Sequence, residues 1–393
     1  MICLRPSTRL LLLLAATLFL SHASIAQSPP SPKSQRLLRF PLTNFYDTAQ
    51  PLKPAQPGEL IRSMEFEEYN LPEDVSATRI LYHSRSGAGE DVASSGIVLY
   101  PEEEQAPPTG WPVIAWAHPW AGVARDCAPS LDRNLPHASF LAMYVRLGYA
   151  VVVTDYAGLG TNFPSAFGNI SANAIDVIYS VAAARHAVPR LSARWIVMGT
   201  GDAAATAIAA AEAEHNIADP NYLGAIAISG LRDSGDAYPG ADDMPGDQAL
   251  FLMHGIKTFD PSFNPADILT PKGLRALSAI EQSCSEPQNI PASEILKPDW
   301  RENQHAREYF ARNRVGMKPA RGPILVISSH TQPALTQASK VFARLCGQHD
   351  EVELQQYPES DPGSVVGDSV RDQISWIEAR FAVKAAQTNC QTH

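Results

Sequence analysis

The chain has 393 residues, of which 45% are hydrophobic, so it can form one large domain or two ordinary domains with a sizeable core. Its formal net charge of −10 at pH 7 disfavours nucleic acid and anionic membrane surfaces as partners. The composition therefore predicts a soluble, acidic globular protein.

The N-terminus has the pattern of a secretory signal peptide. Arg5 and Arg9 form a positive region, and an apolar run follows at residues 10–20. Ser24 and Ala26 place small residues at the −3 and −1 positions of a cleavage site, which predicts a signal peptide at residues 1–26 and cleavage after Ala26. The run is too short for a comfortable membrane span, and no later segment is a candidate for one. We therefore expect a secreted or periplasmic protein.

The cysteines are consistent with an oxidising compartment. Four would remain after cleavage, namely Cys127, Cys284, Cys346 and Cys390. They allow two disulfides in three connectivities, which the sequence leaves open. None lies in a Cys/His pattern typical of zinc sites, so we expect neither a metal nor a cofactor.

Residues 27–57 are rich in proline and are predicted to be irregular, and residues 58–393 are expected to form the folded domain. Three β-like runs open this domain and predict antiparallel strands. They are Leu60 to Tyr69, Thr78 to Ser84 and Ser95 to Tyr100.

Short apolar runs then alternate with helical patterns, which predicts a mostly parallel sheet covered by helices on both faces. The predicted strands are residues 112–117, 150–154, 195–198, 223–228, 323–327 and 352–357. The predicted helices are residues 174–187, 203–214, 335–345 and 369–381.

The alternation stops between Ser229 and Gly322. A segment of this length is too long for a connection, so we expect an inserted helical cap at about residues 230–321. Two interpretations of the cap stay open: a helical buttress, or a lid over an apolar pocket.

One strand leads into a turn that has the frame of a nucleophile elbow. Residues 194–198 are the apolar strand, residues 199–202 form a tight turn of small residues, and an alanine-rich helix follows. In α/β-hydrolases this strand–turn–helix context presents the serine of a G-x-S-x-G motif. Here the nucleophile position is Gly201, which has no side chain.

The combined motifs resemble the secretory lipase family of the α/β-hydrolase superfamily, from about Phe45 to Phe381. The matching segments are residues 79–84, 116–118, 127–130, 148–156, 158–161, 323–327 and 375–381. Each segment is weak alone, but their order and spacing together indicate the α/β-hydrolase fold. The resemblance implies hydrolysis of esters by a serine, an aspartate and a histidine in that chain order.

All three catalytic positions implied by the resemblance are substituted. The elbow pattern G-H-S-Q-G-G of the family aligns with residues 199–204, which places Gly201 at the serine. The acid position after the next-to-last strand holds Gln332, and the histidine position after the last strand holds Pro362. Neither side chain can supply the missing charge or base, so little activity by the family mechanism is expected.

The region expected to bind the oxyanion also departs from the family. The chain reads Ala117-His118-Pro119-Trp120 where the family has A-H-G, and Pro119 has no N–H to donate. The N–H groups of Trp120 and Asp202 remain candidate donors, although the acidic side chain of Asp202 would oppose a developing negative charge.

A rescue is conceivable in which Asp202 is the nucleophile, as in dehalogenase-type hydrolases, and His330 is the base. The plainer interpretation of Asp202 is an acid at a helix start, where it is favourable to the helix dipole. Ser229, His118, Asp155 and Tyr156 also have plain interpretations as structural residues at strand ends.

Three hypotheses follow. The first is a non-catalytic relative of the secretory lipases that binds a small hydrophobic or ester-like ligand. The second is an active ester or lipid hydrolase that uses other residues. The third is a protein-binding scaffold that uses the cap surface. The sequence does not indicate the ligand or the oligomeric state.

Overall fold

The computed structural model describes residues 38–102, 106–119, 121–166, 168–231, 244–284, 290–332 and 334–390. The predicted signal peptide and Trp120 lie outside these residues. Residues 38–390 belong to one compact unit.

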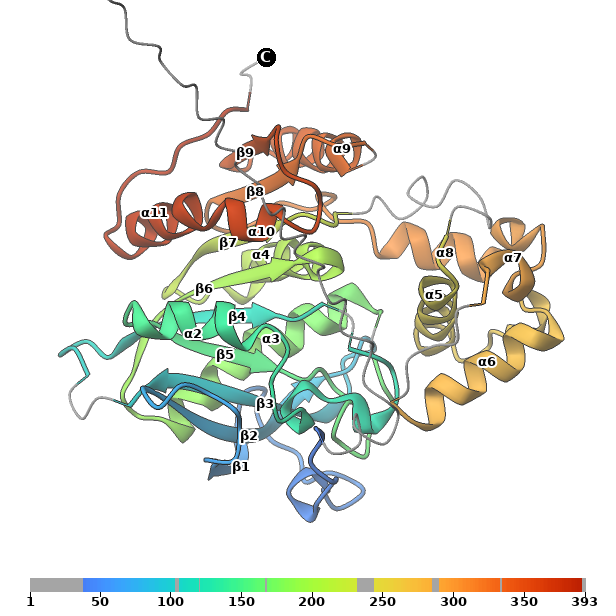
Figure 1. Ribbon diagram of the computed structural model, residues 1–393, viewed down its shortest axis with the longest axis horizontal. Coiled ribbons are helices and arrows are strands. Elements are labelled where there is room, and N and C mark those ends of the chain that lie inside the picture. The colour runs from blue at the N-terminus through green and yellow to red at the C-terminus, as the bar shows by residue number, and fades with distance from the viewer. Residues whose placement is uncertain are drawn as a thin grey trace, which may run out of the picture. The chain divides into compact units, whose positions relative to one another are not determined.

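The core is a sheet of nine strands in the order β1-β2-β3-β5-β4-β6-β7-β8-β9 (Figure 1). The strands are β1 (Leu60–Glu65), β2 (Val75–Arg85), β3 (Asp91–Pro101), β4 (Trp111–Ala117), β5 (Ala150–Thr154), β6 (Leu191–Thr200), β7 (Tyr222–Ile228), β8 (Ile324–Ser329) and β9 (Val352–Tyr357). The first three strands pair antiparallel, β3 pairs antiparallel with β5, and all later neighbours pair parallel. The predicted antiparallel opening and the parallel sheet are therefore confirmed.

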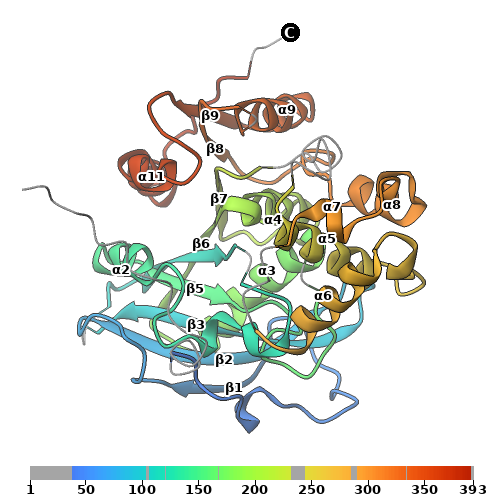
Figure 2. The ribbon, with the colours of Figure 1, turned by 45° about the vertical axis from the view of Figure 1, so that its right-hand side comes forward.

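Helices cover both faces of the sheet (Figure 2). They are α2 (Ala138–Arg146), α3 (Ile170–Ala187), α4 (Ala204–Ile217), α9 (Ala334–Gly347), α10 (Val365–Asp368) and α11 (Val370–Phe381). The α2 and α11 helices share one face, where the Tyr144 hydroxyl donates a hydrogen bond of 2.5 Å to the Gln373 side chain. The α3, α4 and α9 helices lie on the other face. Helix α2 was not among the elements predicted from the sequence.

The interior strands are buried on both faces, which explains their continuous apolar runs. Every residue of β5 and of β8 is buried, and so is all of β6 except Ala193 and Arg194. The alternating pattern of a half-exposed strand is therefore missing from them. The first strand is shorter than predicted and ends at Glu65 rather than Tyr69.

The described part of the insertion between β7 and β8 contains four α-helices (Figure 1). They are α5 (Gly246–Phe259), α6 (Pro271–Gln282), α7 (Ala292–Ile295) and α8 (Gln304–Arg312). Thr270 and Asn303 cap the N-termini of α6 and α8 with their side-chain oxygens. Leu252, Met253 and Phe263 are buried, so apolar side chains of this segment belong to the hydrophobic core.

The cap is tied to the sheet domain by several contacts. The Tyr309 hydroxyl donates a hydrogen bond of 2.5 Å to the carbonyl of Gly168, and the Ile170 N–H donates one of 2.9 Å to Asn313. A disulfide joins Cys127, after β4, to Cys284, after α6. The second disulfide joins Cys346 of α9 to Cys390, so the structure selects one of the three open connectivities.

Candidate active site

Five positions singled out in the sequence follow strands that end at one edge of the sheet. His118 follows β4, Gly201 follows β6 and Ser229 follows β7. Gln332 and Pro362 follow β8 and β9. Because β4, β6, β7, β8 and β9 are parallel, all five lie at the carboxyl ends of the strands, where ligands bind in open α/β sheets.

The turn after β6 has the backbone geometry of an elbow. Gly201 adopts a left-handed conformation with φ of +60°, and a short 3-10 helix, Gly201–Ala203, leads directly into α4. Gly199 lets the strand and the helix approach, because a Cβ there would lie 2.2 Å from the carbonyl oxygen of Ala203. The alanine-rich sequence of α4 serves the same close packing, and Ala207 would contact that Cβ at 3.2 Å.

Space for a side chain remains at Gly201. Among the described residues, a Cβ built on Gly201 would meet only the Cβ of Pro119, at 3.7 Å, which is ordinary van der Waals contact. The position is therefore left-handed and open, and it carries no nucleophile.

The chain after β7 packs directly against the elbow, which the sequence did not predict. Gly230 has a φ of +63°, and a Cβ there would lie 2.4 Å from the Cα of Gly201. Ser229 is buried with a φ of +57°, which is unusual for a residue other than glycine, and its hydroxyl donates a hydrogen bond of 3.0 Å to the carbonyl of Pro362. Ser229 therefore links the elbow region to the loop after β9.

Gln332 and Pro362, the other two positions predicted from the resemblance, are both exposed. Gln332 is exposed, and its side-chain oxygen accepts a hydrogen bond from Thr336 in the first turn of α9. Pro362 is exposed in a turn organised by Asp361, whose carboxylate accepts hydrogen bonds from the N–H groups of Gly363 and Ser364. These hydrogen bonds hold the pKa of Asp361 below its usual value.

The two rescue residues lie on different strands. Asp202 lies in the first turn of the short helix after β6, where an acidic side chain is favourable to the helix dipole. His330 is exposed at the end of β8, and its backbone N–H donates to the carbonyl of Tyr357. Since β7 lies between β6 and β8, the two backbones are separated by two strand spacings, roughly 10 Å.

A buried polar group lies beneath the elbow. Tyr156 is buried with a φ of +67°, and its hydroxyl donates a hydrogen bond of 3.1 Å to the carbonyl of His118. Burial raises the pKa of the Tyr156 phenol, and the nearby charge of Asp202 raises it further.

His118 is buried with a backbone carbonyl beside each ring nitrogen. Its Nδ1 lies 2.7 Å from the carbonyl oxygen of Pro119, and its Nε2 lies 3.3 Å from that of Asp155. Burial lowers the pKa of His118 to about 4. Asp155 is also buried and accepts hydrogen bonds from Ser95 and Ser130, which supports the structural interpretation of both residues.

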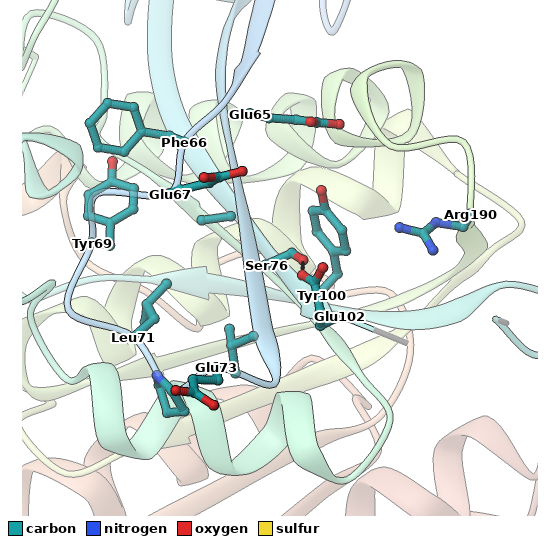
Figure 3. A pocket seen from close by; sticks show the side chains of 13 residues that line it. Glu65, Phe66, Glu67, Tyr69, Leu71, Glu73, Ser76, Tyr100, Glu102 and Arg190 are labelled. Carbon is teal, nitrogen blue, oxygen red and sulfur yellow. Dashed lines mark hydrogen bonds between the residues drawn. The ribbon is translucent and has the colours of Figure 1, made fainter. Parts of the chain in front are cut away.

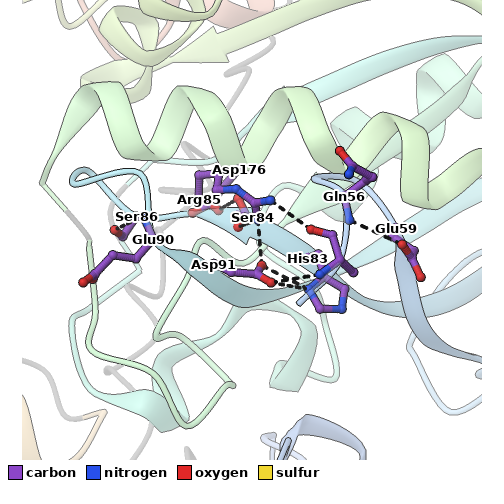
Figure 4. Close-up of polar contacts among 10 residues, drawn as sticks. Gln56, Glu59, His83, Ser84, Arg85, Ser86, Glu90, Asp91 and Asp176 are labelled. Atoms are coloured by element: carbon purple, nitrogen blue, oxygen red, sulfur yellow. Dashed lines mark hydrogen bonds and ion pairs between the residues drawn. The ribbon is translucent and has the colours of Figure 1, made fainter. Parts of the chain in front are cut away.

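His83 and Ser84, adjacent residues of β2, do not form a base and nucleophile that could replace the missing catalytic pair (Figure 4). The Nδ1 of His83 lies 3.0 Å from the carboxylate of Asp91, which also accepts a hydrogen bond from Arg85. Ser84, the next residue, donates instead to Asp176 of α3. Because successive residues of a strand point to opposite faces, His83 cannot activate Ser84.

A cavity lined by several acidic residues lies away from the elbow (Figure 3). It has a volume of about 410 Å³ and is lined by Glu65, Glu67, Glu73, Glu102 and Arg190, with Phe66, Tyr69 and Tyr100 among its apolar walls. Arg190 precedes β6, so this cavity is at the opposite edge of the sheet from Gly201.

Among the described residues, no three His, Cys, Asp or Glu side chains are grouped so as to hold a metal ion. A search of the same residues finds no helix with the length and hydrophobicity of a membrane span.

No protein-family model matches the chain, and no curated protein matches it in sequence. Solved structures do match. The closed state of Candida antarctica lipase A has a TM-score of 0.71 and 15% identity, over 90% of this chain and 89% of that one. A rice cell wall degrading esterase, LipA from Xanthomonas oryzae, has a TM-score of 0.65 and 17% identity, over 84% and 98%. A putative hydrolase from Legionella pneumophila has a TM-score of 0.66 and 15% identity, over 84% and 100%. At these identities the likeness shows a fold, and that fold is the lipase-like α/β-hydrolase fold predicted from the sequence.

Proposed function

We propose that this chain is an exported, non-catalytic protein of the α/β-hydrolase fold that binds a small hydrophobic or ester-like molecule under its helical cap. The observation that carries the proposal is the left-handed turn at Gly201, which keeps an elbow backbone and open space but presents no side chain. A glycine has nothing with which to attack a carbonyl, so the family reaction lacks its first step.

The remaining two positions support the same conclusion. Gln332 is neutral, and its side-chain oxygen accepts a hydrogen bond from Thr336. The carbonyl of Pro362 accepts a hydrogen bond from Ser229. A serine introduced at the elbow alone would therefore have neither a base nor an orienting acid. Because triad members act as a unit, restoring one of them is expected to recover little of the rate.

Export is part of the proposal and rests on the signal pattern at residues 1–26. The disulfides Cys127–Cys284 and Cys346–Cys390 are consistent with an oxidising compartment. The cap, at about residues 230–321, is proposed as the lid of the ligand site, because it is inserted directly after β7 and its neighbouring strands end at the elbow.

The first test is the hydrolysis of p-nitrophenyl esters, from short to long acyl chains, by the chain from Gln27 onward. We expect no release of nitrophenol above buffer. The matched variant Gly201→Ser/Gln332→Asp/Pro362→His should gain turnover, and Gly201→Ala should not. Steady turnover by the natural chain, abolished by Asp202→Asn, would replace the proposal with the active-hydrolase alternative.

The second test addresses the ligand. A fluorescent fatty-acyl probe should bind the natural chain saturably, and an unlabelled ester of the same acyl length should displace it. Absence of saturable binding over the whole range of chain lengths would refute the ligand-binding part of the proposal and favour the scaffold alternative.

A further inference from the structure

The C-terminal segment of the chain runs beside β9, which forms one edge of the sheet (Figure 1). An edge strand presents unpaired backbone N–H and C=O groups that can template pairing with another chain. The Leu354 N–H and C=O both form hydrogen bonds with the C-terminal segment, which shows that they point away from β8. With the two-residue period of a strand, Val352, Leu354 and Gln356 are the residues whose backbone groups face outward.

Asn389 takes the place of one residue of a neighbouring strand. Its side-chain oxygen accepts a hydrogen bond of 2.9 Å from the Leu354 N–H, and its side-chain nitrogen donates one of 2.9 Å to the Leu354 carbonyl. The carbonyl of Val352 accepts from the N–H of Asn389 at 3.2 Å and from the Thr388 hydroxyl at 2.8 Å. The carboxamide of Asn389 thus provides the acceptor and the donor that a residue of a paired strand would provide to the N–H and C=O of Leu354.

The segment is fastened at both ends. The guanidinium of Arg380, in α11, donates hydrogen bonds of 3.0 and 3.1 Å to the carbonyls of Lys384 and Ala385. At the far end, Cys390 is disulfide-bonded to Cys346 of α9, the helix that packs beside β9. Because Asn389 itself is exposed, its hydrogen bonds alone are weak, and the disulfide is what keeps the segment in place.

We propose that residues 382–390 are a covalently fastened cover for the β9 edge, and that the uncovered edge pairs antiparallel with β9 of a second copy of this chain. Release requires a dithiol reductant, which is oxidised to its disulfide while the Cys346–Cys390 bond is reduced to two thiols. Among the described residues, the cover satisfies outward groups at Val352 and Leu354, whereas a second β9 would also reach Gln356.

The sequence of β9 suits pairing with itself. In an antiparallel pair centred on Leu354, Glu353 lies opposite Gln355 of the other copy, and Val352 lies opposite Gln356. No two like charges are directly opposite, so the repulsion that often protects edge strands is absent. This register is two-fold symmetric, which closes the assembly at a dimer.

The test compares the natural chain with the Cys346→Ser/Cys390→Ser variant by light-scattering mass and by hydrogen exchange at the Leu354 amide. The natural chain should have the mass of one chain and a slowly exchanging amide. The double variant should have the mass of two chains at high concentration. Adding Gln356→Pro to it should restore the mass of one chain, because proline removes an outward N–H without touching the side of β9 that pairs with β8.

Two further variants keep the outcome clear if the double variant folds poorly. Asn389→Ala, with the disulfide intact, should speed exchange at Leu354 several-fold, whereas Gln387→Ala in the same segment should not. A double variant that stays at the mass of one chain would overturn the proposal, whether its Leu354 amide exchanges fast or slowly. A dimer that survives Gln356→Pro would overturn it as well, since the contact would then lie elsewhere.

Discussion

At the scale of single residues, the elbow contains two glycines that are required for different reasons. Gly199 is required by space, since a Cβ would collide with the carbonyl of Ala203, while Gly201 is required only by its left-handed backbone. The sequence predicted the position of Gly201 from its local frame. It could not predict the contact of Gly230 with Gly201 or the bond from Ser229 to Pro362, because these join segments that are far apart in the chain.

We therefore expect different costs for alanine at the two glycines. Gly201→Ala should lower the free energy of unfolding by about 1–2 kcal/mol, through backbone strain alone. Gly199→Ala should cost more than about 3 kcal/mol, because backbone atoms of the strand and the helix must move apart. Urea unfolding of both variants measures the difference. Equal costs would show that the elbow is not as open at Gly201 as the contact with Pro119 indicates.

At the scale of elements, the strands and the flanking helices were largely predictable, because their apolar runs are set locally by burial on both faces of the sheet. The cap was predictable as an insertion but not in its attachment. Its anchors are single long-range contacts, Tyr309 to Gly168 and Asn313 to Ile170, and no periodic pattern encodes these. The disulfide pairing was open for the same reason.

The disulfide between Cys127 and Cys284 should control the mobility of the cap. It joins the end of α6 to the loop after β4, where Gly122 lies against both sulfur atoms. The Cys127→Ser/Cys284→Ser variant should lose about 2–4 kcal/mol of stability and be cleaved faster by protease within residues 244–284. Limited proteolysis with mapped fragments checks this.

The matched control for that experiment is the Cys346→Ser/Cys390→Ser variant. It removes the disulfide between α9 and the C-terminal segment, which does not involve residues 244–284, and should leave the rate of cleavage within residues 244–284 unchanged. If both variants open the cap equally, general destabilisation rather than loss of the local tether is the cause.

At the scale of the whole molecule, buried carboxyl groups make stability depend on pH, and Asp176 and Glu214 are two of them. Burial raises the pKa of Asp176 from 3.8 to about 7, against the hydrogen bonds from Ser84 and Ala157. Burial likewise raises the pKa of Glu214 from 4.5 to about 7. Both groups hold a proton in the folded state under conditions where the unfolded chain has lost it.

The sign of the effect follows from the direction of these shifts. The stabilisation is complete below the unfolded pKa values and is lost as the pH rises from about 4 to 7. Each group contributes a slope of up to about 1.4 kcal/mol per pH unit in that window. Urea unfolding across the window should therefore show stability falling as the pH rises.

Asp176→Asn should flatten this dependence, because the amide keeps an acceptor for the Ala157 N–H and carries no charge. Asp361→Asn is the control, since Asp361 is exposed and its pKa is lowered, so this carboxyl is ionised in both states above about pH 5. If the free energy of unfolding rises with pH, buried carboxyl groups do not cause its pH dependence. The same conclusion follows if Asp361→Asn flattens the dependence as much as Asp176→Asn does.

The proposed lack of catalysis requires that this protein, although it has the α/β-hydrolase fold, contains no activated serine. The most direct measurement is intact-mass spectrometry after treatment with a fluorophosphonate probe, which bonds covalently to activated serines. We expect no adduct on the natural chain, and one adduct at position 201 in the Gly201→Ser/Gln332→Asp/Pro362→His variant. A stoichiometric adduct on the natural chain, mapped to Ser229 or any other serine, would show that the protein has an active site of its own and would contradict the account.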